Sequence, residues 1–191
     1  MDTVQPIRDV KKIEAMKKSL LSDKVHGIRN HLLFVLGINS GLRISDLLNL
    51  TVGDVLEDGH PKQAISLREQ KTGKEKVFPI NKNAANAIKM HLEKLGAYNQ
   101  NDPLFASRKG NRPISRVQAW EILNNAAEDV GITESIGTHS LRKTFGYHAF
   151  RAGVGIERLQ SILNHSSPAI TLRYIGITQD DINNVYLNLN L

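Results

Sequence analysis

Cysteine is absent from this sequence of 191 residues. Its absence excludes disulfide bonds and metal sites built on thiolates. Long apolar runs are absent too, because none reaches the roughly 18 residues that a membrane-spanning helix requires. The N-terminal letters M-D-T-V-Q-P lack the apolar segment of a secretion signal. We therefore expect a soluble, cytoplasmic protein.

Acidic residues are fewer than basic ones. The chain has 25 lysines and arginines against 19 aspartates and glutamates, which gives a net charge of +6 at pH 7. This balance suits a polyanionic partner, although a solvated basic surface produces the same count. The length is sufficient for one substantial core and no internal repeat divides the chain, so residues 1–191 are expected to form a single domain.

The spacing of apolar residues predicts a mainly helical chain with a small sheet. Helical periodicity predicts helices over 7–22, 28–38, 44–50, 82–95 and 115–130. The second of these segments is apolar nearly all round, which is typical of a helix buried in the core. Between Thr51 and Ile80, the alternating segments A-I-S-L and K-V-F-P-I predict two strands joined by a turn at T-G. The expected fold class is mixed α+β, mainly α-helical with a small antiparallel sheet.

The sequence also predicts where some side chains on these helices lie. Ser115 and Gln118 have the spacing of a capping box that opens a helix. The residues of that helix expected to face inward are Val117, Trp120, Leu123, Ala127 and Val130, with Trp120 in the core. His91 lies at the edge of the apolar stripe of the preceding helix, and we expect no chemistry from it.

The stretch that begins at Thr138 gathers side chains that suit phosphate binding. His139 and Arg142 are three residues apart and share one helix face. With Thr138 as the N-cap, both lie in the first turn, where free N–H groups attract an anion. His165 follows a short amphipathic helix, and Tyr174 comes nine positions later, near the end of another. Each residue alone is more often ordinary surface or core, whereas the combination predicts an anion clamp that receives a tyrosine hydroxyl.

These motifs resemble one family. H-x-L-R, then L-x-H-S-S, then a tyrosine nine positions after the histidine is the C-terminal signature of the tyrosine recombinases, the phage-integrase and Xer-like enzymes. The family needs a further arginine and a lysine upstream. S-G-L-R-I-S-D-L-L-N-L at 40–50 matches its first arginine box and assigns Arg43. Q-K-T-G-K-E-K-V-F-P-I at 70–80 matches its lysine hairpin and assigns Lys71, with Lys74 as the alternative.

The resemblance implies the DNA breaking-rejoining catalytic fold and site-specific recombination through a 3′-phosphotyrosyl intermediate. Its outcome would be integration, excision or inversion. The six expected catalytic residues are Arg43, Lys71, His139, Arg142, His165 and Tyr174. Arginines replace the electrostatic role of a metal, and the covalent intermediate keeps the bond energy, so no metal and no cofactor is expected.

Each of these residue types has a chemical reason. Forked guanidinium groups suit the nonbridging oxygens of a phosphodiester, a geometry that lysine cannot reproduce. A phenol has an ordinary pKa of about 10, so Tyr174 needs cationic surroundings and a proton acceptor, for which His139 is the best candidate. His165 adds a further donor to the phosphate. The leaving 5′ oxygen needs a proton, which Lys71 can supply.

The resemblance makes double-stranded DNA the expected partner. It implies a homo-tetramer on paired sites, with a monomer or dimer in the absence of DNA. Basic residues of the hairpin, of the 96–113 loop and of the clamp helix are expected to contact DNA. They are Lys74, Lys76, Arg108, Lys109, Arg112 and Lys143.

Three departures from the family's pattern and three rival functions keep other interpretations open. The chain has L-N-H where the family usually has L-G-H, and Lys143 where it often has histidine. The N-terminal DNA-clamping domain is missing, which fits either an isolated catalytic domain or a naturally short recombinase. Asp46 is equally a supporting carboxylate or a simple first-turn helix acid. The rival functions are a type IB topoisomerase, a DNA-binding protein without productive catalysis and, with no motif for it, a phosphate-ester hydrolase.

The end of the chain has a pattern of its own. Apolar residues alternate with polar ones at 183–191, the period of a half-buried strand. Such a strand could pair with the small sheet, in its own subunit or in a neighbouring one. The alternative is fraying of a last helix capped by Thr178 and Asp181.

Overall fold

The computed structural model describes residues 4–108, 112–177, 181 and 187. The N-terminal half contains α1 (Val10–Ser22), α2 (Gly27–Ser40), α3 (Ile44–Leu48), α4 (Val52–Val55), β1 (Leu56–Glu57), β2 (His60–Pro61), β3 (Ala64–Arg68), β4 (Glu75–Pro79) and α5 (Lys82–Leu95). The C-terminal half contains α6 (Arg116–Asp129), α7 (Thr138–Arg151), α8 (Ile156–Ile162) and α9 (Pro168–Ile175). The predicted mixed α+β, mainly helical class is confirmed.

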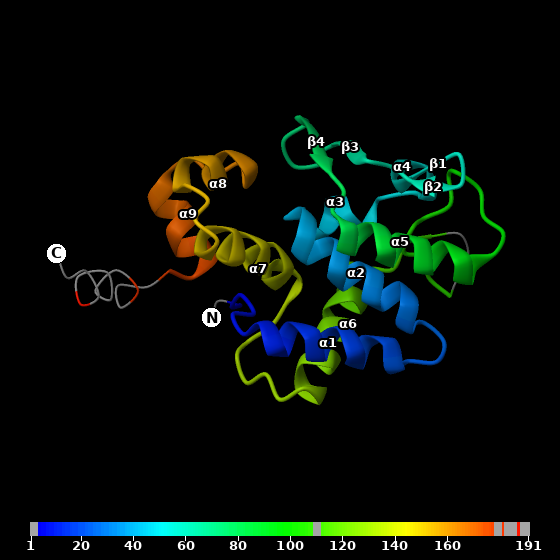
Figure 1. The fold of residues 1–191 in the computed structure, drawn as a ribbon, viewed down its shortest axis with the longest axis horizontal. Helices are drawn as coiled ribbons and strands as arrows, with labels where there is room; N and C mark the ends of the chain where they lie inside the picture. Colours follow the sequence, from blue (N-terminus) through cyan, green and yellow to red (C-terminus); the bar gives the residue numbers. More distant parts are fainter. Residues whose placement is uncertain (1–3, 109–111, 178–180, 182–186, 188–191) are drawn as a thin grey trace.

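Helix α2 is the centre of the core (Figure 1). It packs against α1, α5 and α7, and its middle residues from Leu32 to Leu36 are all buried. Gly41 ends the helix in the left-handed conformation, with φ of 61°, which a residue without Cβ adopts at little cost. The core helix predicted at 28–38 is therefore confirmed, and Arg43 follows two residues after the glycine that ends it.

Two hairpins lie beside α3 and α4. Strands β3 and β4 pair antiparallel, from Ala64 opposite Pro79 to Arg68 opposite Glu75, as the alternating segments predict. Strands β1 and β2 form a separate short antiparallel pair that the sequence pattern did not reveal. The β3–β4 hairpin stands on the same side of the molecule as α8 (Figure 1). Its turn carries Lys71 out of the helical body.

Helix α6 confirms part of the inward face predicted for it, since Leu123 and Ala127 are buried. The capping box is confirmed, since Ser115 Oγ accepts from Gln118 N at 3.1 Å and Gln118 Oε1 accepts from Ser115 N at 2.9 Å. The inward positions of Val117 and Trp120 are wrong, because these side chains are 64% and 48% exposed. The buried face consists mainly of small residues, Ala119, Leu123, Ala126 and Ala127. Helix α6 packs on α1 and α7, and the indole of Trp120 stays largely exposed.

His91 also differs from its predicted place. Its side chain is buried rather than at a helix edge, and its Nε2 atom donates to Leu104 O at 2.9 Å. Because a buried imidazole needs such a partner, His91 ties α5 to the loop that follows it.

Two predicted features lie on residues that the structure does not describe. The strand at 183–191 falls almost entirely outside the described residues, and so does the cap at Thr178. Within the described ranges, no helix is both long and apolar enough to cross a membrane.

Candidate active site

Arg43 emerges between the core and the hairpin. It precedes the first residue of α3, and its neighbours Leu42 and Ile44 are buried, which fixes the backbone at this point. Its Nη1 atom lies 2.8 Å from Glu69 Oε1. Glu69 is itself buried and accepts a hydrogen bond from Thr72 Oγ1 at 2.7 Å. Burial favours the neutral acid, but the bonds from Thr72 and Arg43 prevail and lower the pKa of Glu69.

Glu69 is a site residue that the motifs missed. A carboxylate that stays ionised beside Arg43 orients the guanidinium and occupies part of its hydrogen-bonding capacity. The available signal was weak, namely an acidic residue at the end of a strand, two positions before Lys71. The contact joins residues 26 positions apart, so only folding brings them together.

Asp46 supports the hairpin. It lies in the first turn of α3, is buried, and its Oδ1 atom accepts from Gln70 N at 2.9 Å. Gln70 directly precedes Lys71, so Asp46 anchors the start of the lysine turn to the arginine helix. Of the two interpretations left open from the sequence, the supporting carboxylate agrees with this contact.

Arg142 is the most buried of the proposed cationic residues, with 3% of its surface exposed. Its Nη1 atom donates to Gly41 O at 2.6 Å, and its Nη2 atom donates to Leu163 O. These carbonyls come from the end of α2 and the end of α8. Arg142 therefore joins the core to the C-terminal helices while its guanidinium remains at the site.

The start of α7 differs by one residue from the prediction. Gly137, not Thr138, is the N-cap, and Gly137 N donates to Ser140 Oγ at 3.1 Å. His139 is thus the second helical residue, whereas Arg142 lies one turn further on. The free N–H groups of the first turn are consequently closer to His139 than to Arg142.

His165 and Tyr174 meet at the site, as the spacing predicts. Their rings pack edge to face, with centroids 4.7 Å apart. Helix α9 carries the tyrosine and begins as predicted, since Ser167 Oγ accepts from Ile170 N and a proline occupies its first turn. Burial raises the pKa of Tyr174, and the charges of Arg142 and Arg43 and a hydrogen bond from Arg142 offset only part of this rise.

Thr171 fixes the orientation of the His165 ring. His165 Nδ1 lies 3.1 Å from Thr171 Oγ1, which in turn lies 3.1 Å from Ser167 O. When the threonine hydroxyl donates to Ser167 O, Nδ1 is the donor of the pair, and when it donates to Nδ1, the proton of the neutral ring is on Nε2. Burial, followed by the charges of Arg142 and Arg43, lowers the pKa of His165. A bound phosphate would oppose this shift and favour the cationic donor.

His139 remains accessible at the edge of the site. Partial burial lowers its pKa, and nearby cations add to the shift, chiefly Arg116 and Lys143. A neutral imidazole has a free nitrogen, which is the form that accepts a proton.

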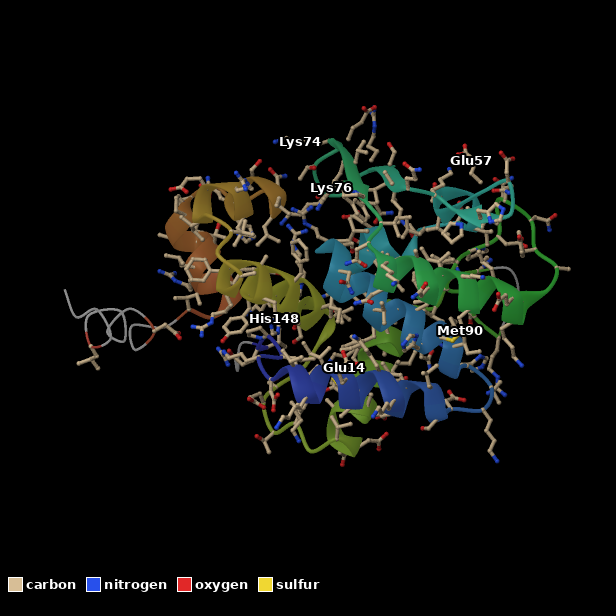
Figure 2. The ribbon with its side chains drawn as sticks, viewed as in Figure 1. Glu14, Glu57, Lys74, Lys76, Met90 and His148 are labelled. Carbon is tan, nitrogen blue, oxygen red and sulfur yellow. The ribbon has the colours of Figure 1, made fainter. Side chains whose placement is uncertain are left out.

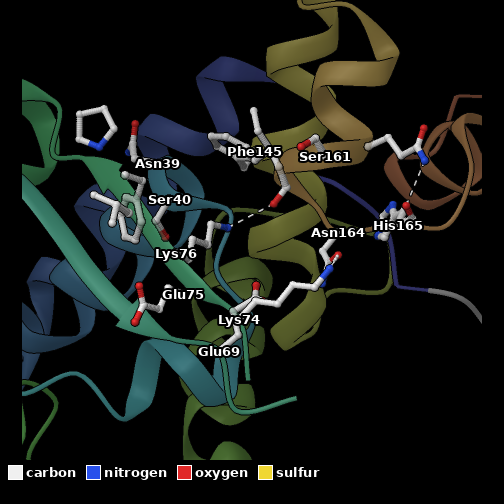
Figure 3. Close-up of a pocket in the computed structure, with 15 residues that line it drawn as sticks. Asn39, Ser40, Glu69, Lys74, Glu75, Lys76, Phe145, Ser161, Asn164 and His165 are labelled. Atoms are coloured by element: carbon white, nitrogen blue, oxygen red, sulfur yellow. Dashed lines mark hydrogen bonds between the residues drawn. The ribbon is translucent and has the colours of Figure 1, made fainter. Parts of the chain in front are cut away.

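The three hairpin lysines occupy different environments. Lys71 is exposed in the turn. Lys74 is also exposed, with Nζ 3.4 Å from Asn164 Oδ1, whereas Lys76 is partly buried and donates to Ile162 O at 3.3 Å. Both bonds cross from the hairpin to the end of α8 (Figure 3). They close one side of a cavity of about 650 Å³ that His165 and Glu69 also line.

Lys76 gives the protein a testable pH dependence. Burial lowers its pKa to about 8, and the charge of Arg142 adds to the effect. The unfolded chain keeps this proton up to about pH 10 and so binds more protons between the two values. We expect stability to rise with pH across this window by at most about 3 kcal/mol, and Lys76→Met to remove that rise. Urea unfolding at several pH values measures it.

Lys74→Met is the matched control, because this lysine is exposed. Its stability should follow the wild-type pH profile. A Lys76→Met profile parallel to the wild type would contradict the burial of a charged amine.

The other residues expected to contact DNA are distributed unevenly. Arg108 and Arg112 are exposed on the loop before α6, and Lys109 lies outside the described residues. Lys143 is buried, and its Nζ atom donates to Val4 O at 2.7 Å. Its ammonium therefore has a partner inside the protein, and its contact with DNA stays a prediction.

Known proteins of one family are similar to this chain. The model of the phage integrase family matches residues 8–180. The probable integrase/recombinase YoeC of Bacillus subtilis (strain 168) is 44% identical over 186 residues, which cover 97% of each chain. The tyrosine recombinase XerC of Pelobacter propionicus is 27% identical over 178 residues, which cover 93% of this chain and 57% of XerC.

Solved structures share the fold. The crystal structure of XerA recombinase superposes with a TM-score of 0.77 at 21% identity, over 100% of this chain and 66% of that one. XerH bound to its palindromic difH substrate, after cleavage, gives 0.74 at 20% identity, over 94% and 51%. The chain thus spans nearly all of YoeC but little more than half of XerC and of the XerH chain.

Proposed function

Because the chain belongs to the phage integrase family, we propose that it cuts and rejoins DNA with Tyr174 as the nucleophile. The chain is a tyrosine recombinase, an enzyme of site-specific DNA recombination, and has the catalytic fold of these enzymes. The family, function and fold inferred from the sequence motifs are confirmed. The proposal concerns which residues carry out the reaction.

The position of Tyr174 supports its assignment as the nucleophile. Its ring packs on His165, and Arg142 and Arg43 act electrostatically on its hydroxyl. These side chains come from the loop before α3, from α7, from the loop after α8 and from α9, so the convergence is a property of the tertiary structure. A phenol beside two arginines has both a site for the phosphate and a means of stabilising its own anion.

The chemistry then follows from the groups present. The oxygen of Tyr174 attacks the scissile phosphorus, and its proton passes to His139. Arg43 and Arg142 stabilise the charge that develops on the nonbridging oxygens. The bond from phosphorus to the 5′ oxygen breaks, and Lys71 supplies the proton that this oxygen needs. The 5′ hydroxyl of another strand reverses these steps, which restores a phosphodiester and frees the tyrosine.

We propose double-stranded DNA as the substrate and a tetramer on paired sites as the active assembly. XerH was solved on its DNA substrate, and the net charge of +6 suits the same kind of partner. The 183–191 tail is proposed to couple protomers, and the cytoplasm is proposed as the location because the proposed substrate is DNA. Sedimentation on DNA with paired sites, with and without residues 184–191, measures both the stoichiometry and the contribution of the tail.

Trapping on a nicked duplex tests the reaction. A substrate that loses its short 5′ fragment after cleavage has no nucleophile left for rejoining, so protein should accumulate covalently on the DNA. Activity should persist in excess EDTA, because arginines carry the electrostatic role. Tight DNA binding without a covalent product would favour a DNA-binding protein that has lost catalysis. Rejoining of only the original strand would favour a topoisomerase.

A further inference from the structure

Residues 4–8, here called the N-terminal strap, are bound to the C-terminal helices. Ile7 is buried, its N–H donates to Thr144 Oγ1 at 2.9 Å, and its carbonyl accepts from His148 Nε2 at 2.9 Å. Gln5 N donates to Ser135 O at 2.8 Å. Figure 1 shows the dark blue start of the chain against α7, and Figure 2 labels His148 on that helix. At least 130 positions of sequence separate the two sides of these contacts.

Two strap contacts reach the surroundings of the tyrosine. Val4 O accepts from Lys143 Nζ, and that ammonium lies 5.3 Å from the centroid of the Tyr174 ring. Arg8 Nη2 donates to Gly176 O at 3.1 Å. Gly176 is the residue that ends α9, in the left-handed conformation with φ of 78°. The strap thus touches the helix of the tyrosine at its end and, through Lys143, at the face of the ring.

Arg8 is itself held in place. Its Nη2 atom also donates to Gln5 Oε1 at 3.2 Å, and its guanidinium lies 5.6 Å from the centroid of the Tyr147 ring on α7. A cation at the C-terminus of a helix meets unpaired carbonyls and the negative end of the helix dipole. The contact is therefore favourable in both geometry and charge.

Helix α9 needs such support because it is short. It has eight residues, of which Thr171 and Ile175 are buried, and an isolated helix of this length is unstable in water. On its other side it packs closely on α7, where a Cβ on Gly146 would lie only 2.6 Å from Ile175 Cγ2. Contacts with α7 and α8 seat the helix, and Arg8 adds a hydrogen bond to the carbonyl of Gly176, the residue that ends it.

We propose that the N-terminal strap positions the nucleophile, with Arg8 as the positioning residue that holds α9 through the carbonyl of Gly176. This inference rests on the proposed role of Tyr174. Arg8 does not touch the reacting atoms. It acts by keeping the tyrosine helix seated beside Arg142 and His165, so its loss reduces the fraction of molecules in which the hydroxyl is aligned for attack.

The rate of covalent-complex formation at saturating nicked DNA tests the functional part. Arg8→Ala should slow this step by roughly 10- to 100-fold, the range for loss of one hydrogen bond from a charged group, while DNA affinity changes less than about twofold. Arg8→Lys should recover part of the rate, because a cation stays near the carbonyl. Arg151→Ala, which removes an exposed arginine at the end of α7, should leave the rate unchanged. An Arg8→Ala rate equal to the wild type would overturn the proposal.

Hydrogen exchange without DNA tests the positioning part independently of any chemistry. In Arg8→Ala, amides at 171–175 should exchange faster, with those of α2 unchanged. Faster exchange in both helices would show a general loss of stability and would reject a positioning role. The same comparison in a Tyr174→Phe background distinguishes the two proposals. Should Tyr174→Phe still form the covalent complex, the proposed nucleophile fails, whereas the exchange result still decides whether Arg8 holds α9.

Discussion

Tyr174→Phe is expected to abolish the covalent protein–DNA complex while leaving DNA binding intact. The substitution removes only the hydroxyl, and the edge-to-face packing on His165 and the cation above the ring remain available. Loss of a nucleophile removes the pathway rather than slowing it, so the complex should fall by at least about a thousandfold. Gel separation under denaturing conditions measures the complex, and a mobility shift measures binding.

Other tyrosines provide the controls for this experiment. Tyr147→Phe keeps the ring beside Arg8 and should retain cleavage. Tyr186→Phe, at a position outside the described residues, should retain it as well. A covalent complex that persists in Tyr174→Phe and disappears in either control would assign the nucleophile to that other tyrosine.

Lys71→Ala should slow cleavage severely on DNA with a normal 5′ oxygen. General-acid catalysis typically contributes about 10²- to 10⁴-fold, so a loss in that range is expected. A 5′-bridging phosphorothiolate should restore most of the rate, because its sulfur leaves without protonation. The fold should be unaffected, since Lys71 is exposed in a turn. Comparison of single-turnover rates on the two substrates measures the rescue.

The neighbouring lysines make this comparison specific. Lys74→Ala and Lys76→Ala should show no preferential rescue by the phosphorothiolate. Lys76 is the more informative of the two controls, because its amine is close enough to Arg142 and Arg43 to be affected by their charges. The contrary result is equal impairment of Lys71→Ala on both substrates together with rescue of Lys76→Ala by the phosphorothiolate. That result would assign the general acid to Lys76 on β4 instead of Lys71.

The sequence by itself determined the features that depend on neighbouring residues. The periodicity of 28–38 predicted the core helix, and the alternation around T-G predicted the hairpin. Ser167 and Pro168 predicted the start of α9, which the structure confirms. Each of these signals spans a few turns or a few residues of chain, so composition and spacing are sufficient to reveal it. The local motifs that identify the family are of the same kind.

Only the tertiary structure decided which groups meet. The pairing of Glu69 with Arg43, the burial of Lys143 against Val4 and the bond from Arg8 to Gly176 join distant parts of the chain. Trp120 shows the same limit, because its exposure depends on which side of α6 packs against the neighbouring helices. Contacts of this kind depend on how helices dock, and helical periodicity identifies an apolar face without specifying its partner.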